Sequence, residues 1–292
     1  MSAPELRQDL VTGDWILISS KRGKRPDEFA EKRTRLVPPK KDIFANPEEA
    51  AGGPVILGYG EGNDWLLQII PNKFPAIEHD MESVKEKHIG PYHMIPGVGF
   101  HDVVVTRHPK NNFATLPRHE AQIVFQAFKD RYHMLMDDHH LAYVSIFHNW
   151  GPKAGASVYH PHYQIIALPV VPPDMRHSLT GSYEYFKNKG ISVQSVIIEW
   201  EQQEKKRIIF ENKHAIAFAP YASREPFELR VYPKAHMPFF EDTDETVMHA
   251  VVEALQTSLI KLEKDLTFLI TIFLFGLHHL RRKNGISITI GI

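Results

Sequence analysis

The sequence predicts an α+β fold made of two related units, each an antiparallel sheet with a packed helix. Two observations support this prediction. The first half combines β-branched and apolar runs, typical of strands, with one long periodic helix, and the second half repeats that order. A short motif also precedes the strands of each half, Pro-Asn-Lys-Phe-Pro at 71–75 and Glu-Asn-Lys-His at 211–214, which indicates an internal duplication.

The first half contains four predicted strands and one predicted helix. The strands are the runs at 65–70, 102–106, 142–148 and 164–168. The helix extends from Pro117 to about 138, because proline suits a first helical turn and apolar residues recur at helical spacing, at Ile123, Ala127, Phe128 and Leu135. Residues 20–63 are rich in Lys, Arg, Pro, Gly and Glu with little periodicity, and they predict a long loop.

The second half contains three predicted strands and a second helix. The strands are the runs at 207–210, 215–219 and 227–232. The helix begins at about 243 and carries one apolar face, formed by Val247, Val251, Leu255, Leu259 and Leu262. We therefore expect a first unit over 1–180 and a second unit over 181–292.

The composition excludes several classes of function. The 292 residues carry a formal charge of −1, so no electrostatic field favours nucleic acid as a partner. The absence of cysteine excludes disulfides, thiolate zinc sites and cysteine nucleophiles, whereas the eighteen histidines supply many candidate nucleophiles and ligands. No signal-peptide core opens the chain, and the longest apolar run, 268–277, is about half of what a membrane-spanning helix needs. We therefore expect a cytoplasmic protein with no membrane partner.

The segment 149–164 carries the chemistry. A loop of small residues leads into His160-Pro-His162-Tyr-Gln164 and then an apolar strand. In an extended chain alternate side chains share a face, so the two histidines and the glutamine point the same way if the extension is kept. Ser157 and the loop amides could donate hydrogen bonds to phosphate oxygens. A histidine placed there could attack phosphorus, while the glutamine amide binds the phosphoryl oxygens without protonating the leaving group.

Two other interpretations of the histidines carry less weight. A lone His-x-His is more often a solvated or structural pair on an edge strand, but the Ala-Gly-Ala-Ser loop before it and Gln164 after it favour phosphoryl chemistry. A histidine-rich metal-binding module is disfavoured because most of the histidines are scattered singly along the chain.

The run from 151 to 169 resembles the galactose-1-phosphate uridylyltransferase family of the histidine-triad superfamily. The resemblance extends to Thr-Gly-Asp-Trp at 12–15, to the arginines at 22 and 25, to the motif at 71–75 and to Pro-Lys-x-His at 233–236, and covers residues 9 to about 265. It implies that both units are histidine-triad-like.

The resemblance implies a ping-pong transfer between UDP-glucose and a hexose 1-phosphate, in galactose metabolism. His162 would attack the α-phosphorus and hold UMP, and Gln164 would bind the phosphoryl oxygens. The remaining contacts to the nucleotide and its phosphates would come from Arg22, Arg25, Asn72, Asn149, Ser157 and His160. Relatives work as dimers, so a homodimer is implied as well.

Several alternatives remain open at this point. A phosphorylase acting on ADP-glucose or a dinucleoside polyphosphate would keep His162 and change the partners. An inactive nucleotide-binding remnant would bind without turnover. A hydrolase is disfavoured because Gln164 stands where a proton-donating histidine would be expected.

The chain departs from the family where zinc would bind. Family members often carry Cys-x-x-Cys where this chain has Asp42-Ile-Phe-Ala45. Those cysteines, the first histidine of His-Pro-His and one further histidine make a structural zinc site. His160 and His108 alone cannot assemble four-coordinate zinc, and Asp42 could add only one oxygen. The sequence therefore assigns no cofactor, and His160 and His108 would be metal ligands only if a depleted zinc site survives. The alternative role of His160 is to orient the loop through a hydrogen bond.

The chain also departs from the family after about 266. Relatives continue with a Tyr-Asn-Tyr segment and end the second unit with a His-x-His strand, and neither motif is present here. Permitted codons for 267–291, read two bases later, yield Tyr-Asn-Tyr and His-Tyr-His in the expected order. We hypothesise a frameshift near Thr267, which would leave the second sheet without its last strands. An intact gene sequence with no slip at this point would refute the hypothesis.

Overall fold

The computed structural model describes residues 3–19, 41–79, 85–150, 158–225, 227–237, 239–265 and 271–278. The chain divides into two compact units. The motif unit, which contains His-Pro-His, comprises 36–172 and 270–285, and the second unit comprises 1–35, 173–269 and 286–292. Each unit contains an antiparallel sheet and at least one long helix, so the predicted α+β class is confirmed. The predicted boundary at 180 stays a prediction.

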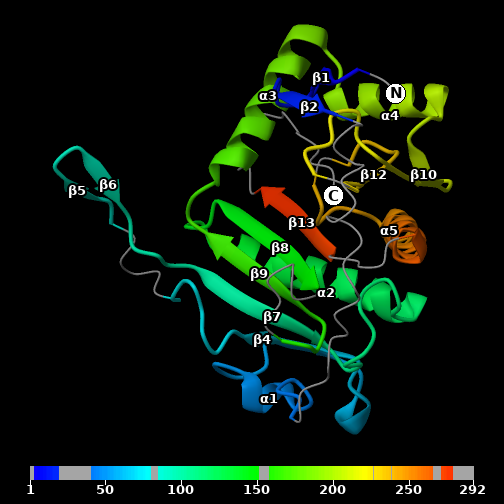
Figure 1. Cartoon of the computed structure of the whole chain (residues 1–292). Helices are drawn as coiled ribbons and strands as arrows, with labels where there is room; N and C mark the ends of the chain where they lie inside the picture. Colours follow the sequence, from blue (N-terminus) through cyan, green and yellow to red (C-terminus); the bar gives the residue numbers. More distant parts are fainter. Residues whose placement is uncertain are drawn as a thin grey trace. The chain divides into compact units, whose positions relative to one another are not determined.

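The motif unit is built on a six-stranded antiparallel sheet (Figure 1). Its strands lie in the order β13 (Thr271–His278), β8 (Tyr143–Trp150), β9 (His162–Leu168), β7 (Phe100–Thr106), β4 (Leu67–Pro71) and β3 (Leu57–Tyr59). The unit also contains the short helices α1 (Pro47–Ala50) and η2 (Gly62–Asp64) and the hairpin of β5 (Lys87–Ile89) and β6 (Tyr92–Met94).

Helix α2 (Arg118–Met136) covers one face of this sheet. Its buried Phe128 packs on the fully buried Tyr163 of β9, with the ring centroids 5.5 Å apart, and Phe125 packs on Phe128 at 5.7 Å. Burying each such side chain stabilises the fold by about 1.5–3 kcal/mol. A buried ion pair joins the helix to β7, since Arg131 Nε donates to Asp102 Oδ2 at 2.7 Å.

The second unit contains a three-stranded antiparallel sheet and three longer helices. The sheet has the order β10 (Ile208–Glu211), β11 (Ala215–Phe218) and β12 (Arg230–Pro233). Helix α5 (Glu245–Asp265) contacts all three strands, and most of its predicted apolar face is buried. The other elements are α3 (Pro173–Lys189), α4 (Val193–Glu204) and the hairpin of β1 (Glu5–Gln8) and β2 (Trp15–Ile18).

The seven predicted strands and both predicted helices correspond to elements of the structure. Helices α3 and α4 were not predicted. Ser182 is the only buried residue of α3, and a helix so exposed shows no apolar stripe. Helix α4 buries two polar residues, Gln194 and Glu201, beside Val193 and Ile198, which interrupts its apolar pattern. The predicted loop at 20–63 is wrong over its described part, 41–63, which contains α1, β3 and η2.

Strand β13 lies in the segment that departs from the family. It pairs with β8 along its whole length, from Thr271 opposite Trp150 to His278 opposite Tyr143. This segment therefore adds an edge strand to the motif unit, and the second unit's sheet has three strands within the described residues. The frameshift stays a hypothesis.

Candidate active site

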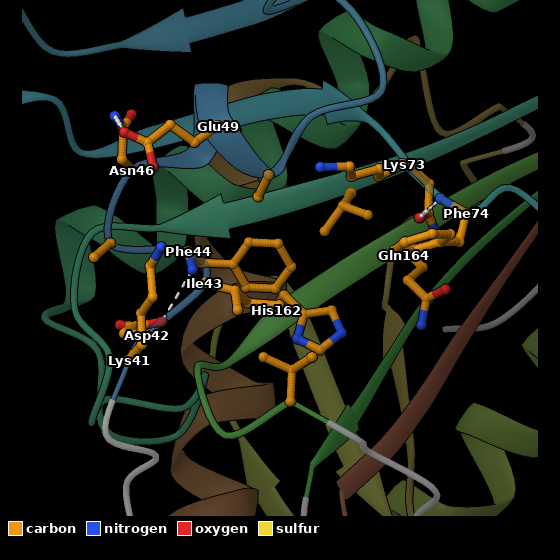
Figure 2. Close-up of a pocket in the computed structure, with 15 residues that line it drawn as sticks. Lys41, Asp42, Ile43, Phe44, Asn46, Glu49, Lys73, Phe74, His162 and Gln164 are labelled. Carbon is orange, nitrogen blue, oxygen red and sulfur yellow. Dashed lines mark hydrogen bonds between the residues drawn. The ribbon is translucent and has the colours of Figure 1, made fainter.

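One face of the motif unit's sheet carries the predicted nucleophile and its glutamine neighbour. His162 pairs with Val105 and Gln164 with Val103, and alternation along β9 places both polar side chains opposite the face that α2 covers. The segment 41–50 lies over this face and lines a pocket of about 700 Å³ together with His162 and Gln164 (Figure 2). The other lining residues include Asp42, Phe44, Asn46, Glu49, Asn72, Lys73, Phe74 and Val158.

The tautomer of His162 is fixed by the backbone. Its Nδ1 lies 2.9 Å from the carbonyl oxygen of His160, which can only accept, so Nδ1 carries the hydrogen and donates it. Nε2 therefore has the free lone pair. Burial lowers the pKa of His162, and the hydrogen bond to His160 opposes this shift without cancelling it. At neutral pH the ring is neutral, which is the form a nucleophilic imidazole needs.

A second histidine supports the same strand end from β8. The buried His148 donates a hydrogen bond from Nδ1 to the carbonyl oxygen of His162 at 2.7 Å, and its ring centroid lies 4.6 Å from that of Tyr163. Burial lowers the pKa of His148 to about 4, so this ring is also neutral at neutral pH. His148 thus fixes the backbone at His162.

The orientation of the Gln164 amide is set by His101. The backbone N–H of Ala76 donates to Nδ1 of His101 at 3.0 Å, so the hydrogen of the neutral ring is on Nε2. That Nε2–H donates to Oε1 of Gln164 at 2.9 Å. The NH₂ group of Gln164 is consequently the part of its side chain that can donate to a ligand.

Two of the predicted nucleotide contacts lie within the described residues beside these groups. Asn72 lies against the His101 ring: its Oδ1 accepts from the backbone N–H of Phe74 at 2.9 Å, and its Nδ2 is 3.0 Å from Nε2 of His101. With the hydrogen of Nε2 directed at Gln164, this second contact is a close approach and not a hydrogen bond. Asn149 is half-buried on β8, two residues beyond the partner of Gln164 and on the same face. Arg22, Arg25 and Ser157 lie outside the described residues.

His160 does not share the orientation of His162 and Gln164. Strand β9 begins only at His162, and a bend at 159–160 turns the His160 ring away from the pocket and into the protein, where it is 1% exposed. Its Nδ1 lies 2.8 Å from Oδ2 of Asp42, and its Nε2 lies 2.6 Å from the carbonyl oxygen of Thr106. The expected common direction of the three side chains therefore holds for His162 and Gln164 only.

The described residues do not fit the family's structural zinc. Both ring nitrogens of His160 face oxygen atoms at hydrogen-bonding distance, so neither is open to a metal ion. Nε2 of His108 faces Oε1 of Glu120 at 3.4 Å. In the described part of the chain, the groups of three or more residues that could converge on an ion lie elsewhere, at Glu86, His88 and His93 and at Asp138, His139 and His140.

Three residues around the pocket were not assigned a role from the sequence. His101 gave no signal as a lone histidine, because only the strand register shows that it is a diagonal neighbour of Gln164. Phe44, whose ring centroid is 5.2 Å from that of His162, lies in a segment predicted as a loop. Lys73 lines the pocket. It follows Asn72 in the motif at 71–75, and this position in the motif was the strongest indication in the sequence that Lys73 belongs to the site.

The described helices include none that is long and apolar enough to cross a membrane. An antiparallel sheet that presents His-Pro-His-x-Gln over a pocket is the arrangement of the histidine-triad superfamily. The chain belongs to the galactose-1-phosphate uridylyltransferase family within it: the family model described as "Galactose-1-phosphate uridyl transferase, N-terminal domain" matches residues 1–172. The resemblance seen in the motifs is thereby confirmed.

Two similar proteins and two similar structures span most of the chain. ADP-glucose phosphorylase of Arabidopsis thaliana is 31% identical over 278 residues, which are 90% of this chain and 75% of that protein. Galactose-1-phosphate uridylyltransferase of Thermotoga maritima is 27% identical over 80% of this chain and 67% of that protein. The crystal structure of the Arabidopsis phosphorylase with bound ADP-glucose is similar with a TM-score of 0.76 and 27% identity, covering 97% of this chain and 92% of that one. A structure titled "Structure of uridylyltransferase" has a TM-score of 0.69 and 28% identity, covering 94% and 79%.

Proposed function

We propose that this chain transfers a nucleotidyl group from a nucleoside-diphosphate glucose through a covalent intermediate on His162. The observation that carries the proposal is the neutral His162 ring, with Nδ1 bound to the His160 carbonyl and Nε2 left as a nucleophile beside the Gln164 amide. A nucleophile and an oriented amide donor in one pocket are the two parts that a phosphorus-centred displacement needs.

In the first step the Nε2 lone pair of His162 attacks the α-phosphorus of the donor. The N–P bond forms as the bond from phosphorus to the bridging oxygen breaks, and glucose 1-phosphate leaves with the electron pair. The phosphorylated ring keeps its Nδ1–H on the carbonyl of His160, which stabilises the positive charge that the ring acquires. The leaving group is a phosphate that is stable as an anion, so the Gln164 NH₂ has only to bind a non-bridging oxygen.

In the second step an acceptor oxygen attacks the same phosphorus and restores His162. The first candidate acceptor is galactose 1-phosphate with UDP-glucose as donor, supported by the motif resemblance and by the Thermotoga relative named a uridylyltransferase. The second candidate is inorganic phosphate with ADP-glucose as donor, supported by the Arabidopsis relative named ADP-glucose phosphorylase, which is 31% identical.

The remaining site assignments follow the resemblance. We assign phosphate contacts to Arg22, Arg25, Asn149 and Ser157, and a contact in the nucleotide pocket to Asn72. The exposed ammonium group of Lys73, at the pocket wall, adds a point charge suited to a phosphate. The homodimer and the cytoplasmic location stay predictions of the resemblance and composition.

The test is the intact mass of the protein after mixing with UDP-glucose or with ADP-glucose. A covalent UMP adduct would support the transferase and a covalent AMP adduct the phosphorylase. The adduct should be absent from His162→Ala and present in His139→Ala, a matched change of an exposed histidine in the same unit. Nucleotide binding without an adduct from either donor would overturn the proposal in favour of an inactive remnant.

A further inference from the structure

We propose that the Asp42–His160 pair takes the place of the family's structural metal and holds His162 in its nucleophilic orientation. Asp42 is then a positioning residue, which acts through His160 and does not touch the reacting phosphorus. This role rests on the proposed function of His162 and names the groups that prepare it.

The contacts of His160 define its protonation state. A carboxylate oxygen of Asp42 and the carbonyl oxygen of Thr106 face its two ring nitrogens, at 2.8 and 2.6 Å. Neither oxygen has a hydrogen to donate, and a neutral imidazole carries only one N–H. Both contacts are hydrogen bonds only if both nitrogens carry hydrogen, so His160 is an imidazolium paired with the Asp42 carboxylate.

This protonation state is incompatible with a metal ligand. A ligating histidine must offer a ring lone pair, and a doubly protonated ring has none. Asp42 occupies the position where the resemblance places the first cysteine of Cys-x-x-Cys. A carboxylate–imidazolium pair therefore stands where relatives have thiolates and a zinc ion, and it fixes the same ring with hydrogen bonds.

The fixed ring of His160 controls the direction of its own carbonyl group. Pro161 follows it, so the conformation of His160 is confined to the extended region and the φ of residue 161 is locked by the proline ring. The carbonyl of His160 accepts the Nδ1–H of His162 at 2.9 Å. Anchoring the side chain of His160 thus fixes the acceptor that keeps Nε2 of His162 free.

Asp42 is itself held in place, and its segment touches both histidines. Its Oδ1 accepts the backbone N–H of Phe44 at 3.0 Å, while Oδ2 binds His160. The Phe44 ring packs edge-on to His160 at 5.9 Å and against His162 at 5.2 Å between centroids. The Asp42 side chain is 26% exposed, so this clamp sits at the margin of the pocket and not deep in the core.

The first test needs no catalysis. Imidazole ¹⁵N NMR of histidine-labelled full-length protein should show two protonated nitrogens for His160 and Nδ1–H with a free Nε2 for His162. In Asp42→Ala, His160 should lose one ring hydrogen and His162 should show a mixture of tautomers. A singly protonated His160 in the wild type, or an unchanged His162 in the variant, would overturn the proposal. Because the readout is independent of turnover, it separates this proposal from the proposed function.

The second test measures the adduct. Asp42→Ala should slow nucleotidyl-histidine formation about 100-fold in single turnover, the cost of a nucleophile misplaced by about 1 Å, with little change in donor affinity. Asp42→Asn keeps the shape of the side chain, so a slower rate in this variant would not be due to misfolding. In Asp42→Asn, His160 should also lose its second ring hydrogen. The matched control is Asp138→Ala, which removes another Asp–His contact of the motif unit and should leave the rate unchanged. Stoichiometric zinc in the purified wild type, or adduct formation that a chelator abolishes, would overturn the proposal.

Discussion

Acid should destabilise the motif unit through His148. The side chain is fully buried, and burial lowers its pKa from an ordinary value of 6.5 to about 4. Between these values the unfolded chain binds a proton that the folded chain does not, so the free energy of unfolding falls as the pH falls. The loss begins near pH 6.5 and ends near pH 4, and at 1.36 kcal/mol for each pKa unit it amounts to about 3 kcal/mol.

The assay is the free energy of opening of β8 and β9, measured by hydrogen exchange and mass spectrometry of the full chain at several pH values in this window. His148→Asn removes the titrating group but retains an amide that can donate to the carbonyl of His162. Between pH 6.5 and pH 4, the free energy of opening should therefore fall by about 3 kcal/mol less in the variant than in the wild type. His139→Asn, at an exposed site, should keep the wild-type dependence.

The difference between variants isolates His148 from other groups. Burial also lowers the pKa of His162, so this second histidine contributes to the wild-type dependence with the same sign. It is present in both proteins and largely cancels from the comparison. Parallel pH dependences for the wild type and His148→Asn would refute the reasoning, because they would mean that His148 gains a proton as easily when folded as when unfolded.

Three further predictions concern the site and the core. His101→Phe keeps a ring but loses the donor to Gln164, so it should slow adduct formation in rapid-quench measurements. The decrease in rate should be no larger than the roughly 100-fold decrease expected for Gln164→Ala, and an unchanged rate would contradict the orienting role of His101. Arg131→Met leaves the buried Asp102 carboxylate unpaired and should cost about 3–5 kcal/mol in urea unfolding, most of it recovered by adding Asp102→Leu; no recovery would show that the loss came from packing. Because protonation of His162 removes its lone pair and burial lowers its pKa, adduct formation should fall on acidification with a midpoint below 6.5, and a higher midpoint would be inconsistent.

The elements that the sequence predicted are those with a strong apolar period. Helix α2 and helix α5 each bury one face on a sheet, and the central strands are β-branched and apolar. Helix α3 buries a single residue, so its apolar pattern carries no helical period. The short elements between 41 and 63 were missed because they are defined by their pairing with β4 and by the turns around them, and not by composition.

The site was predictable to the extent that it is local. Alternation along one strand was enough to place His162 and Gln164 together. The same rule failed at His160, because the chain bends before β9 and the ring's partner, Asp42, is 118 residues away in sequence. His101 lies 63 residues from Gln164, and only the register of β7 against β9 connects them.

The histidines around the start of β9 show how oxygen acceptors can specify proton states without a metal. His148 and His162 each face one carbonyl oxygen with Nδ1 and are buried, which keeps them neutral. His160 faces two acceptors, one of them the carboxylate of Asp42, and is therefore the charged member of the group. Its charge further lowers the pKa of His162, so the same ring that orients His162, the proposed nucleophile, also favours its unprotonated form. On this reasoning, the loss of the Asp42 carboxylate would weaken both effects at once, since the positive charge on His160 and the direction of its carbonyl depend on one hydrogen bond.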